Sequence, residues 1–216
     1  GASAIAVAVA LLLAYGVRLN PNPVTKSATR VAGLGYAVPG SVIAVGILIP
    51  LAWFDNMVDG WLRTSFGVSS GLLLSGTIAA LMFAYVVRFL AVSLNTVDAS
   101  LAKVTPNMDG AARTLGMGSV ATVGRVHAPI IAPSLMTAAL LVFVDVMKEL
   151  PATLILRPFD FNTLAVYAFE LASDEQLREA AAPALTIVAA GLIPVALLSL
   201  AISRARPGRA QVAVRP

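Results

Sequence analysis

The chain has 216 residues, of which 58% are hydrophobic and 12% are charged, with a formal net charge of +4 and a mean hydropathy of +0.87. Soluble domains carry roughly a quarter of charged residues, so this composition excludes an ordinary soluble protein and predicts a protein embedded in a bilayer. The sequence contains no cysteine and one histidine, His127, which excludes a disulfide framework, a cysteine-bound metal and a pair of histidine ligands.

Five apolar segments follow one another along the chain, at residues 2–17, 36–54, 70–94, 132–151 and 183–203. A helix needs about 20 residues to cross a hydrocarbon core of about 30 Å, and these segments reach or approach that length. They lack the two-residue alternation of a membrane barrel, so we predict an all-α integral membrane fold with about five transmembrane helices in a single domain, 1–216. The first segment is short and the chain starts at Gly1 without Met, as expected of a fragment or of the second half of a longer chain.

The segments between these spans alternate in charge. Segment 18–35, segment 95–131 and the tail after residue 203 carry more Lys and Arg than acids, whereas segments 55–69 and 152–182 carry more Asp and Glu. The positive-inside rule therefore predicts that the three basic segments are cytoplasmic, with the N-terminus outside and the C-terminus in the cytoplasm. Because the positive charges lie at the ends of apolar runs, they indicate topology rather than binding of nucleic acid.

The cytoplasmic segment 95–131 contains the chain's most specific motif. Asp109-Gly-Ala-Ala-Arg-Thr-Leu-Gly116 is followed, after nine residues, by Val126-His-Ala-Pro129. Ala, Arg and Leu favour a helix, Asp109 suits the start of that helix, and Gly116 can end it by adopting a positive φ. Pro129 is expected in the first turn of the next span, where a missing N–H costs least.

This spacing resembles the cytoplasmic coupling loop of permease subunits of bacterial ABC importers. Ala111 and Ala112 match the alanine pair of that loop. Gly110 stands where the family has its acidic residue, and the acid of this chain comes one position earlier. Val126 stands where the family has isoleucine. The resemblance implies that residues 95–131 form a coupling loop whose short helix docks in a groove of a cytoplasmic ATPase.

Further stretches resemble ferric-iron permeases, in particular the second half of such proteins. They lie at residues 36–40, 84–89, 143–158 and 162–166. This resemblance implies a type I ABC importer permease fold in the bacterial inner membrane. It also implies three kinds of partner: two cytoplasmic ATPase subunits, a periplasmic substrate-binding protein and a second permease half, either fused or homodimeric. The sequence has no Gly-x-x-x-x-Gly-Lys-Ser/Thr motif, so we expect no enzyme activity in this chain, with ATP and Mg²⁺ bound by the separate ATPase.

Three charged residues, Asp145, Lys148 and Glu149, lie within the fourth apolar segment. A charge at the bilayer centre costs about 2.5–3.5 kcal/mol, so such residues are expected to be paired or functional. On a continuous helix the three fall within about 100° of each other and form one polar face. We predict that this face lines the outer part of a translocation path or forms a gate there. The alternative is an ion-paired cluster that only fixes helix packing.

Three other residues have simpler interpretations. Arg88 is expected near the cytoplasmic end of the third span, where its long side chain can reach the membrane surface. His127 is expected to be a surface or interface residue of the cytoplasmic loop, with no metal site around it. Pro151 is expected to end or kink the fourth helix.

These observations favour the permease subunit of an ATP-driven importer, with ferric iron as the cargo. The same machinery with another cargo, such as thiamine, sulfate, molybdate or phosphonate, remains an alternative. An ion-driven secondary transporter is an alternative from another class, and copurification of an ATPase would discriminate against it. A membrane enzyme would need a second buried carboxylate facing Asp145.

Overall fold

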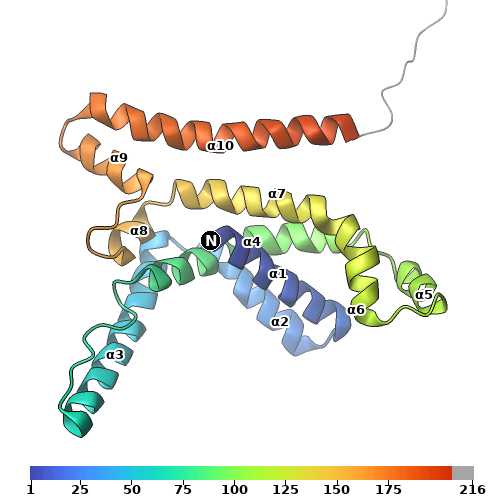
Figure 1. Cartoon of the computed structure of the whole chain (residues 1–216), viewed down its shortest axis with the longest axis horizontal. Helices are drawn as coiled ribbons and strands as arrows, with labels where there is room; N and C mark the ends of the chain where they lie inside the picture. The colour runs from blue at the N-terminus through green and yellow to red at the C-terminus, as the bar shows by residue number, and fades with distance from the viewer. Residues whose placement is uncertain (206–216) are drawn as a thin grey trace, which may run out of the picture.

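The computed structural model of the chain describes residues 1–205, and within this range the chain is helical without strands (Figure 1). The predicted all-α fold is therefore confirmed. The elements are α1 (Ala2–Leu19), α2 (Pro23–Ala32), η1 (Gly33–Ala37), α3 (Gly40–Phe66), α4 (Ile78–Leu101), α5 (Pro106–Thr114), α6 (Ser119–Thr122), η2 (Val123–His127), α7 (Ala128–Met147), α8 (Pro151–Leu156), α9 (Leu164–Ser173) and α10 (Leu177–Ala205).

Five helical stretches of the described residues are long and apolar enough to cross a membrane. They are Ala2–Leu19, Gly40–Phe66, Ile78–Leu101, Val120–Met147 and Leu177–Ala196. Each overlaps one predicted segment in the same order, so the predicted number of spans is confirmed. Arg206, Arg209 and Arg215, which contributed to the expected cytoplasmic tail, lie outside the described residues.

The second and third spans differ from the predicted bounds, because a loop folds back along α3. The Asp55 carboxylate accepts hydrogen bonds from the backbone N–H groups of Leu74 (3.0 Å) and Ser75 (2.8 Å), and Asp59 accepts one from the Ser69 hydroxyl (2.7 Å). Residues from 67 to 77 are thus held against the extended end of α3 instead of entering the next helix. The side chain of Thr77 caps the start of α4. The predicted start of the third span at residue 70 was therefore wrong.

Helix α4 lies at the centre of the packing. Half of its apolar window is buried, against 17–22% in the other four candidate spans. Helix α1 packs on it through small residues at every fourth position, Ala2, Ala6, Ala10 and Ala14, all of them buried. Small side chains on one stripe let two helices approach closely within a membrane. On another side α7 packs against α4 through Ile131 and Val142.

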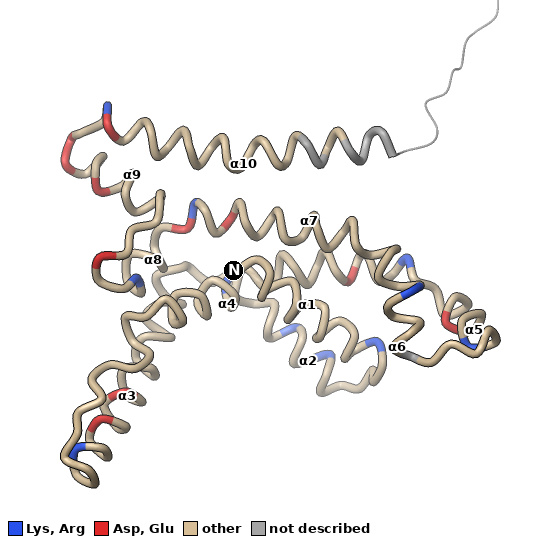
Figure 2. The backbone as a smooth tube through the Cα atoms, viewed as in Figure 1, with Lys and Arg blue, Asp and Glu red and all other residues tan. Residues whose placement is uncertain are grey.

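Charged residues separate towards two ends of the molecule. Figure 2 shows mostly Lys and Arg around α2, the end of α1 and the α5–α6 region, with an acidic residue in α5, and mostly Asp and Glu on the far half of α3 and around α8, α9 and the start of α10, with single basic residues among them. The end of α1 meets the end of α4, because Arg18 donates hydrogen bonds to the carbonyls of Leu101 (3.4 Å) and Val104 (3.0 Å). The basic segments on either side of the second and third spans therefore lie at one end, as the alternating topology requires. The side of the membrane on which this end lies stays a prediction.

The chain is not helical just before the second span. Helix α2 runs into the short 3-10 helix η1, and α3 begins only at Gly40 after a non-helical turn. Gly35 of η1 lies directly against the backbone of Val87 in α4, so close that a Cβ at Gly35 would overlap the Val87 carbonyl oxygen. The break thus lies beside the middle of α4 and not at the end of the bundle.

Candidate coupling segment and membrane cleft

The motif segment forms the helix predicted for it. Helix α5 begins at Pro106, contains Asp109 in its first turn and ends at Thr114. Gly116 follows with a φ of +76°, its backbone N–H bonded to the carbonyl of Arg113 at 2.9 Å. A positive φ is strained for residues with a side chain, which explains why glycine occupies the position. The predicted helix and glycine stop are both confirmed.

This segment exposes several small and apolar residues. Ala112 is buried against the rest of the chain, whereas Gly110 and Ala111 are exposed. Beyond the glycine stop, the side chains of Leu115 and Val120 are 80% and 87% exposed. Small residues beside exposed apolar ones form a surface that another protein can approach closely. We call Gly110, Ala111, Leu115 and Val120 the coupling face.

A continuous helical stretch leads from this segment into the membrane. It begins with α6, passes through the π-helical turn η2 at Val123–His127, and continues as α7. Pro129 lies in the first turn of α7, as predicted, and Val126 is half-buried in the π turn. Single π turns inside helices often mark functional positions. In this chain the π turn lies where the segment that contains α5 and α6 joins the span.

Asp109 is held by two partners that the sequence did not reveal. Its carboxylate accepts a hydrogen bond from Arg18 at 2.8 Å and one from Nε2 of His127 at 2.7 Å. Burial raises the pKa of the Asp109 carboxyl, but the hydrogen bonds from Arg18 and His127 outweigh it, and the net effect is a lowered pKa. Asp109 is therefore ionised at neutral pH. The expected surface position of His127 was wrong, because its side chain is 5% exposed and lies against Tyr15.

The three charged residues of the fourth span do not share one face. Helix α7 ends at Met147, because Pro151 offers no N–H to the Met147 carbonyl and its ring would clash there. Asp145 and Lys148 form an ion pair at 2.8 Å. Glu149 turns instead into the space between α4 and α8. The predicted single polar face was therefore wrong for Glu149.

Glu149 pairs with Arg88 inside the helical core. One carboxylate oxygen accepts from Nε of Arg88 at 2.9 Å, and the other accepts from the backbone N–H of Ala152 at 3.1 Å. Arg88 also donates to the carbonyl of Val38 at 2.7 Å, just before α3 begins. Arg88 lies about 15 Å along α4 from Ile78 at 1.5 Å per residue, so its expected position near the cytoplasmic end was wrong. Arg88 and Glu149 connect η1, α3, α4 and α8.

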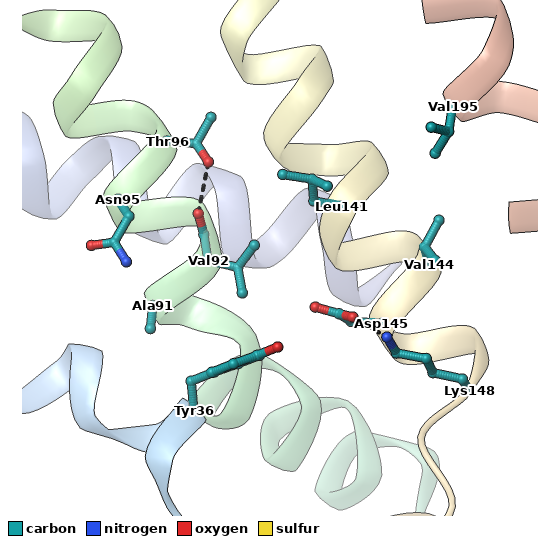
Figure 3. Close-up of a pocket in the computed structure, with 10 residues that line it drawn as sticks. All are labelled: Tyr36, Ala91, Val92, Asn95, Thr96, Leu141, Val144, Asp145, Lys148 and Val195. Atoms are coloured by element: carbon teal, nitrogen blue, oxygen red, sulfur yellow. Dashed lines mark hydrogen bonds and ion pairs between the residues drawn. The ribbon is translucent and has the colours of Figure 1, made fainter. Parts of the chain in front are cut away.

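Asp145 and Lys148 line an open cleft of about 560 Å³ between α4, α7, α10 and η1. Figure 3 shows the Tyr36 hydroxyl directed towards Asp145 and Lys148, with the amide of Asn95 on the α4 side. Further lining residues are apolar, among them Leu141 and Val195. The cleft combines an ion pair, a phenol and an amide with apolar walls. Such a lining can contact a polar cargo without holding it tightly.

Sequence reasoning missed Tyr15, Arg18, Tyr36 and Asn95. One signal was present for Arg18, because Arg and Asp are rarely buried unless paired, and Arg18 and Asp109 both come from segments predicted to be cytoplasmic. No pattern within the sequence indicated Tyr36, since it reaches the cleft only through the break before α3.

The known proteins to which this chain is similar are transport permeases. No family model matches the chain. The Fe(3+)-transport system permease protein FbpB 2 of Haemophilus influenzae is 31% identical over 169 residues, which are 78% of this chain and 30% of the relative. A protein of Salmonella typhimurium named as a 2-aminoethylphosphonate transport system permease is 25% identical over 179 residues, covering 83% of this chain and 60% of the relative. A ferric transport system permease protein from the same Haemophilus strain is 26% identical over 168 residues, covering 74% and 26%.

These relatives define the class of protein. The chain is homologous to permeases of ABC importers, and with five apolar helices it is a multi-pass protein of the inner membrane. It spans 30% of the length of the first ferric-iron relative and 60% of the phosphonate relative.

Proposed function

We propose that this chain forms part of the membrane-spanning permease of an ATP-driven importer of ferric iron. The observation that carries the proposal is the 31% identity to an Fe(3+)-transport permease over 78% of the chain. The motif segment, with its exposed coupling face and its glycine stop at Gly116, supports the ATP-driven mechanism. In this proposal the chain hydrolyses nothing itself.

The proposal assigns a place to each partner. Two ATPase subunits, which bind ATP and Mg²⁺, dock on the coupling face. A periplasmic binding protein delivers the cargo at the opposite end, where the acidic segments around α8 and α9 lie. A second permease half, fused or homodimeric, completes the path. ATP binding then biases the permease between outward-facing and inward-facing states.

Uptake into proteoliposomes tests this proposal. The full-length transporter is reconstituted with its neighbouring ATPase and binding protein, and uptake of radiolabelled ferric iron is followed with and without ATP. We expect ATP-dependent uptake, and we expect Gly116→Trp to reduce it about tenfold or more, since a bulky residue at φ +76° both strains the turn and projects beside the coupling face. Gly67→Trp is the matched control, because Gly67 also has a positive φ (+68°) and open space for a Cβ but follows α3, away from the coupling face.

The possible results separate the alternatives. ATPase binding without iron uptake would contradict ferric iron as the cargo and favour an importer of another cargo. Uptake that needs neither ATP nor the ATPase would contradict the importer and favour an ion-driven transporter. Phosphonate is the second candidate cargo, because the 2-aminoethylphosphonate relative matches 83% of the chain and Lys148 supplies a cation to the cleft.

The cleft gives a separate prediction. We propose that Asp145 and Lys148 line the translocation path, and we expect Lys148→Met to lower the rate of uptake about tenfold. The substitution leaves Asp145 as an unpaired negative charge in the cleft, where it would hold a cationic cargo or repel an anionic one. The ATPase should still copurify, since Lys148 is exposed and far from the coupling face.

Lys26→Met is the control for this substitution, because it removes the same charge from an exposed position of α2 outside the cleft. Normal uptake by the Lys148→Met transporter would contradict a role of the ion pair in the path. The measurement is the initial rate of uptake per assembled complex.

A further inference from the structure

Four side chains form an unbroken chain of polar contacts between the coupling segment and the spans. They are Tyr15 and Arg18 of α1, Asp109 of α5 and His127 of the π turn. Arg18 donates to Asp109 at 2.8 Å, His127 Nε2 meets Asp109 at 2.7 Å, and the Tyr15 hydroxyl meets His127 Nδ1 at 3.0 Å. The Tyr15 and His127 rings are stacked, with centroids 6.0 Å apart.

The charges fix the direction of these contacts. An ionised carboxylate only accepts hydrogen bonds, so Nε2 of His127 carries a proton and donates it to Asp109. On the other side of the ring, Nδ1 of His127 meets the Tyr15 hydroxyl, so the imidazole connects Asp109 to α1. Arg18 also donates to the Val104 carbonyl just beyond α4. One carboxylate on α5 is therefore connected to α1, to the end of α4 and to the start of α7.

Apolar packing ties α5 to the spans only weakly. Ala112 is its buried residue, and an alanine side chain offers little contact area. The charge-assisted bonds of Asp109, which are stronger than neutral hydrogen bonds, are the directional connections between α5 and the spans. A displacement of α5 must therefore pull on α1 through Arg18 and on α7 through His127.

We propose that Asp109, His127, Arg18 and Tyr15 form the mechanical linkage that converts movement of the coupling segment into movement of α1 and α7. This inference rests on the proposed function. The four are positioning residues: they contact neither the cargo nor ATP. The π turn Val123–His127 places the linkage at the junction of the cytoplasmic segment and the span.

A linkage and a set of contacts that only stabilises the fold differ in one measurable quantity, the number of ATP molecules hydrolysed per cargo imported. Loss of contacts that only stabilise the fold lowers the amount of assembled transporter, and the complexes that remain hydrolyse the normal number of ATP molecules per cargo. Loss of a linkage leaves the ATPase active while import falls. The ratio of the two rates is independent of the amount of assembled protein.

The test uses the complete reconstituted transporter with ferric iron as the probe. Asp109→Asn is expected to raise the ATP consumed per imported iron about tenfold, with the ATPase rate within about twofold of wild type. Tyr15→Phe keeps the stacked ring and removes only the hydroxyl, and we expect it to raise the ratio about twofold to threefold. Asp98→Asn is the matched control, because it removes the same charge from an exposed position near the end of α4.

The double variant Asp109→Asn with His127→Phe adds an independent readout. Members of one contact chain are not additive, so the double variant should raise the ratio no further than Asp109→Asn alone. If the wild type imports with ATP, and Asp109→Asn and Tyr15→Phe consume the same amount of ATP per imported iron as the wild type, the linkage is refuted while the proposed function stands. If the wild type imports without ATP, both are refuted. A raised ratio in Asp98→Asn equal to that in Asp109→Asn would also refute the linkage.

Discussion

Replacing Glu149 by alanine is expected to lower the free energy of unfolding by about 3–5 kcal/mol, a large share of the stability of a typical domain. The substitution leaves the Arg88 guanidinium charged in the helical core without a carboxylate. Glu149 is 6% exposed and Arg88 20% exposed, so little water is available to compensate. The backbone N–H of Ala152 loses its acceptor as well.

The pair can be removed with less damage if both charges go together. Arg88→Met with Glu149→Gln leaves no unpaired charge, and the glutamine carbonyl can still accept from Ala152. We therefore expect the double variant to be more stable than Glu149→Ala, because breaking a buried pair costs more than replacing both partners. The measurement is thermal unfolding of the purified full-length protein in detergent, followed by the fraction that stays monodisperse.

An exposed pair provides the control. Arg63→Ala removes the ion pair between Arg63 and Asp59, in which the arginine side chain is 62% exposed, and we expect a change below about 1 kcal/mol. If Glu149→Ala melts at the temperature of Arg63→Ala, the Arg88–Glu149 pair does not stabilise the fold more than an exposed pair does.

Gly35→Ala is expected to cost about 2–3 kcal/mol, in spite of the small size of the added group. A Cβ at this position would overlap the Val87 carbonyl oxygen and lie 2.9 Å from the Val87 carbonyl carbon. Both atoms belong to the backbone of α4, which cannot rotate away as a flexible side chain can. Either η1 or α4 must shift, and forced repacking of this kind costs several times the energy of an ordinary surface substitution.

Gly33→Ala is the matched control, two residues away in the same 3-10 helix. Its Cβ would meet only a methyl group of Leu94 at 4.0 Å, which is an ordinary contact. Thermal unfolding should therefore separate the two variants clearly. Gly35→Ala should also slow cargo uptake, because Tyr36 enters the cleft from η1. Equal stability of the two variants would contradict the close approach of η1 to α4.

The number and order of the spans followed from the sequence, because membrane insertion depends mainly on length and apolar composition. The glycine stop at Gly116 was predictable for a similar reason, since a positive φ is a local requirement of one residue. The bounds of the spans were less predictable. The start of α4 depends on carboxylates of α3 that hold the preceding loop, and nothing in the apolar pattern of residues 70–77 indicates this.

The candidate sites, too, were predictable only where they depend on local sequence and not on how the helices pack. The helical periodicity that placed Glu149 beside Asp145 and Lys148 fails because the helix ends two residues before Glu149. Arg88 finds its partner 61 residues away, and Tyr15 and His127 are 112 residues apart. Such pairings arise from how helices pack, which a single sequence does not display. A charge in an apolar run indicated that a partner must exist, but not which residue it is.

The break before α3 has a consequence for how the protein is made. Val38 lies in the non-helical turn just before α3, the helix that forms the second candidate span. The Val38 carbonyl in this turn accepts its hydrogen bond from Arg88 of α4. A nascent chain emerges from the ribosome with α3 ahead of α4, so the Val38 carbonyl has no donor from Arg88 until α4 reaches the insertion machinery. The second and third crossings are thus expected to leave the translocon for the lipid as a pair.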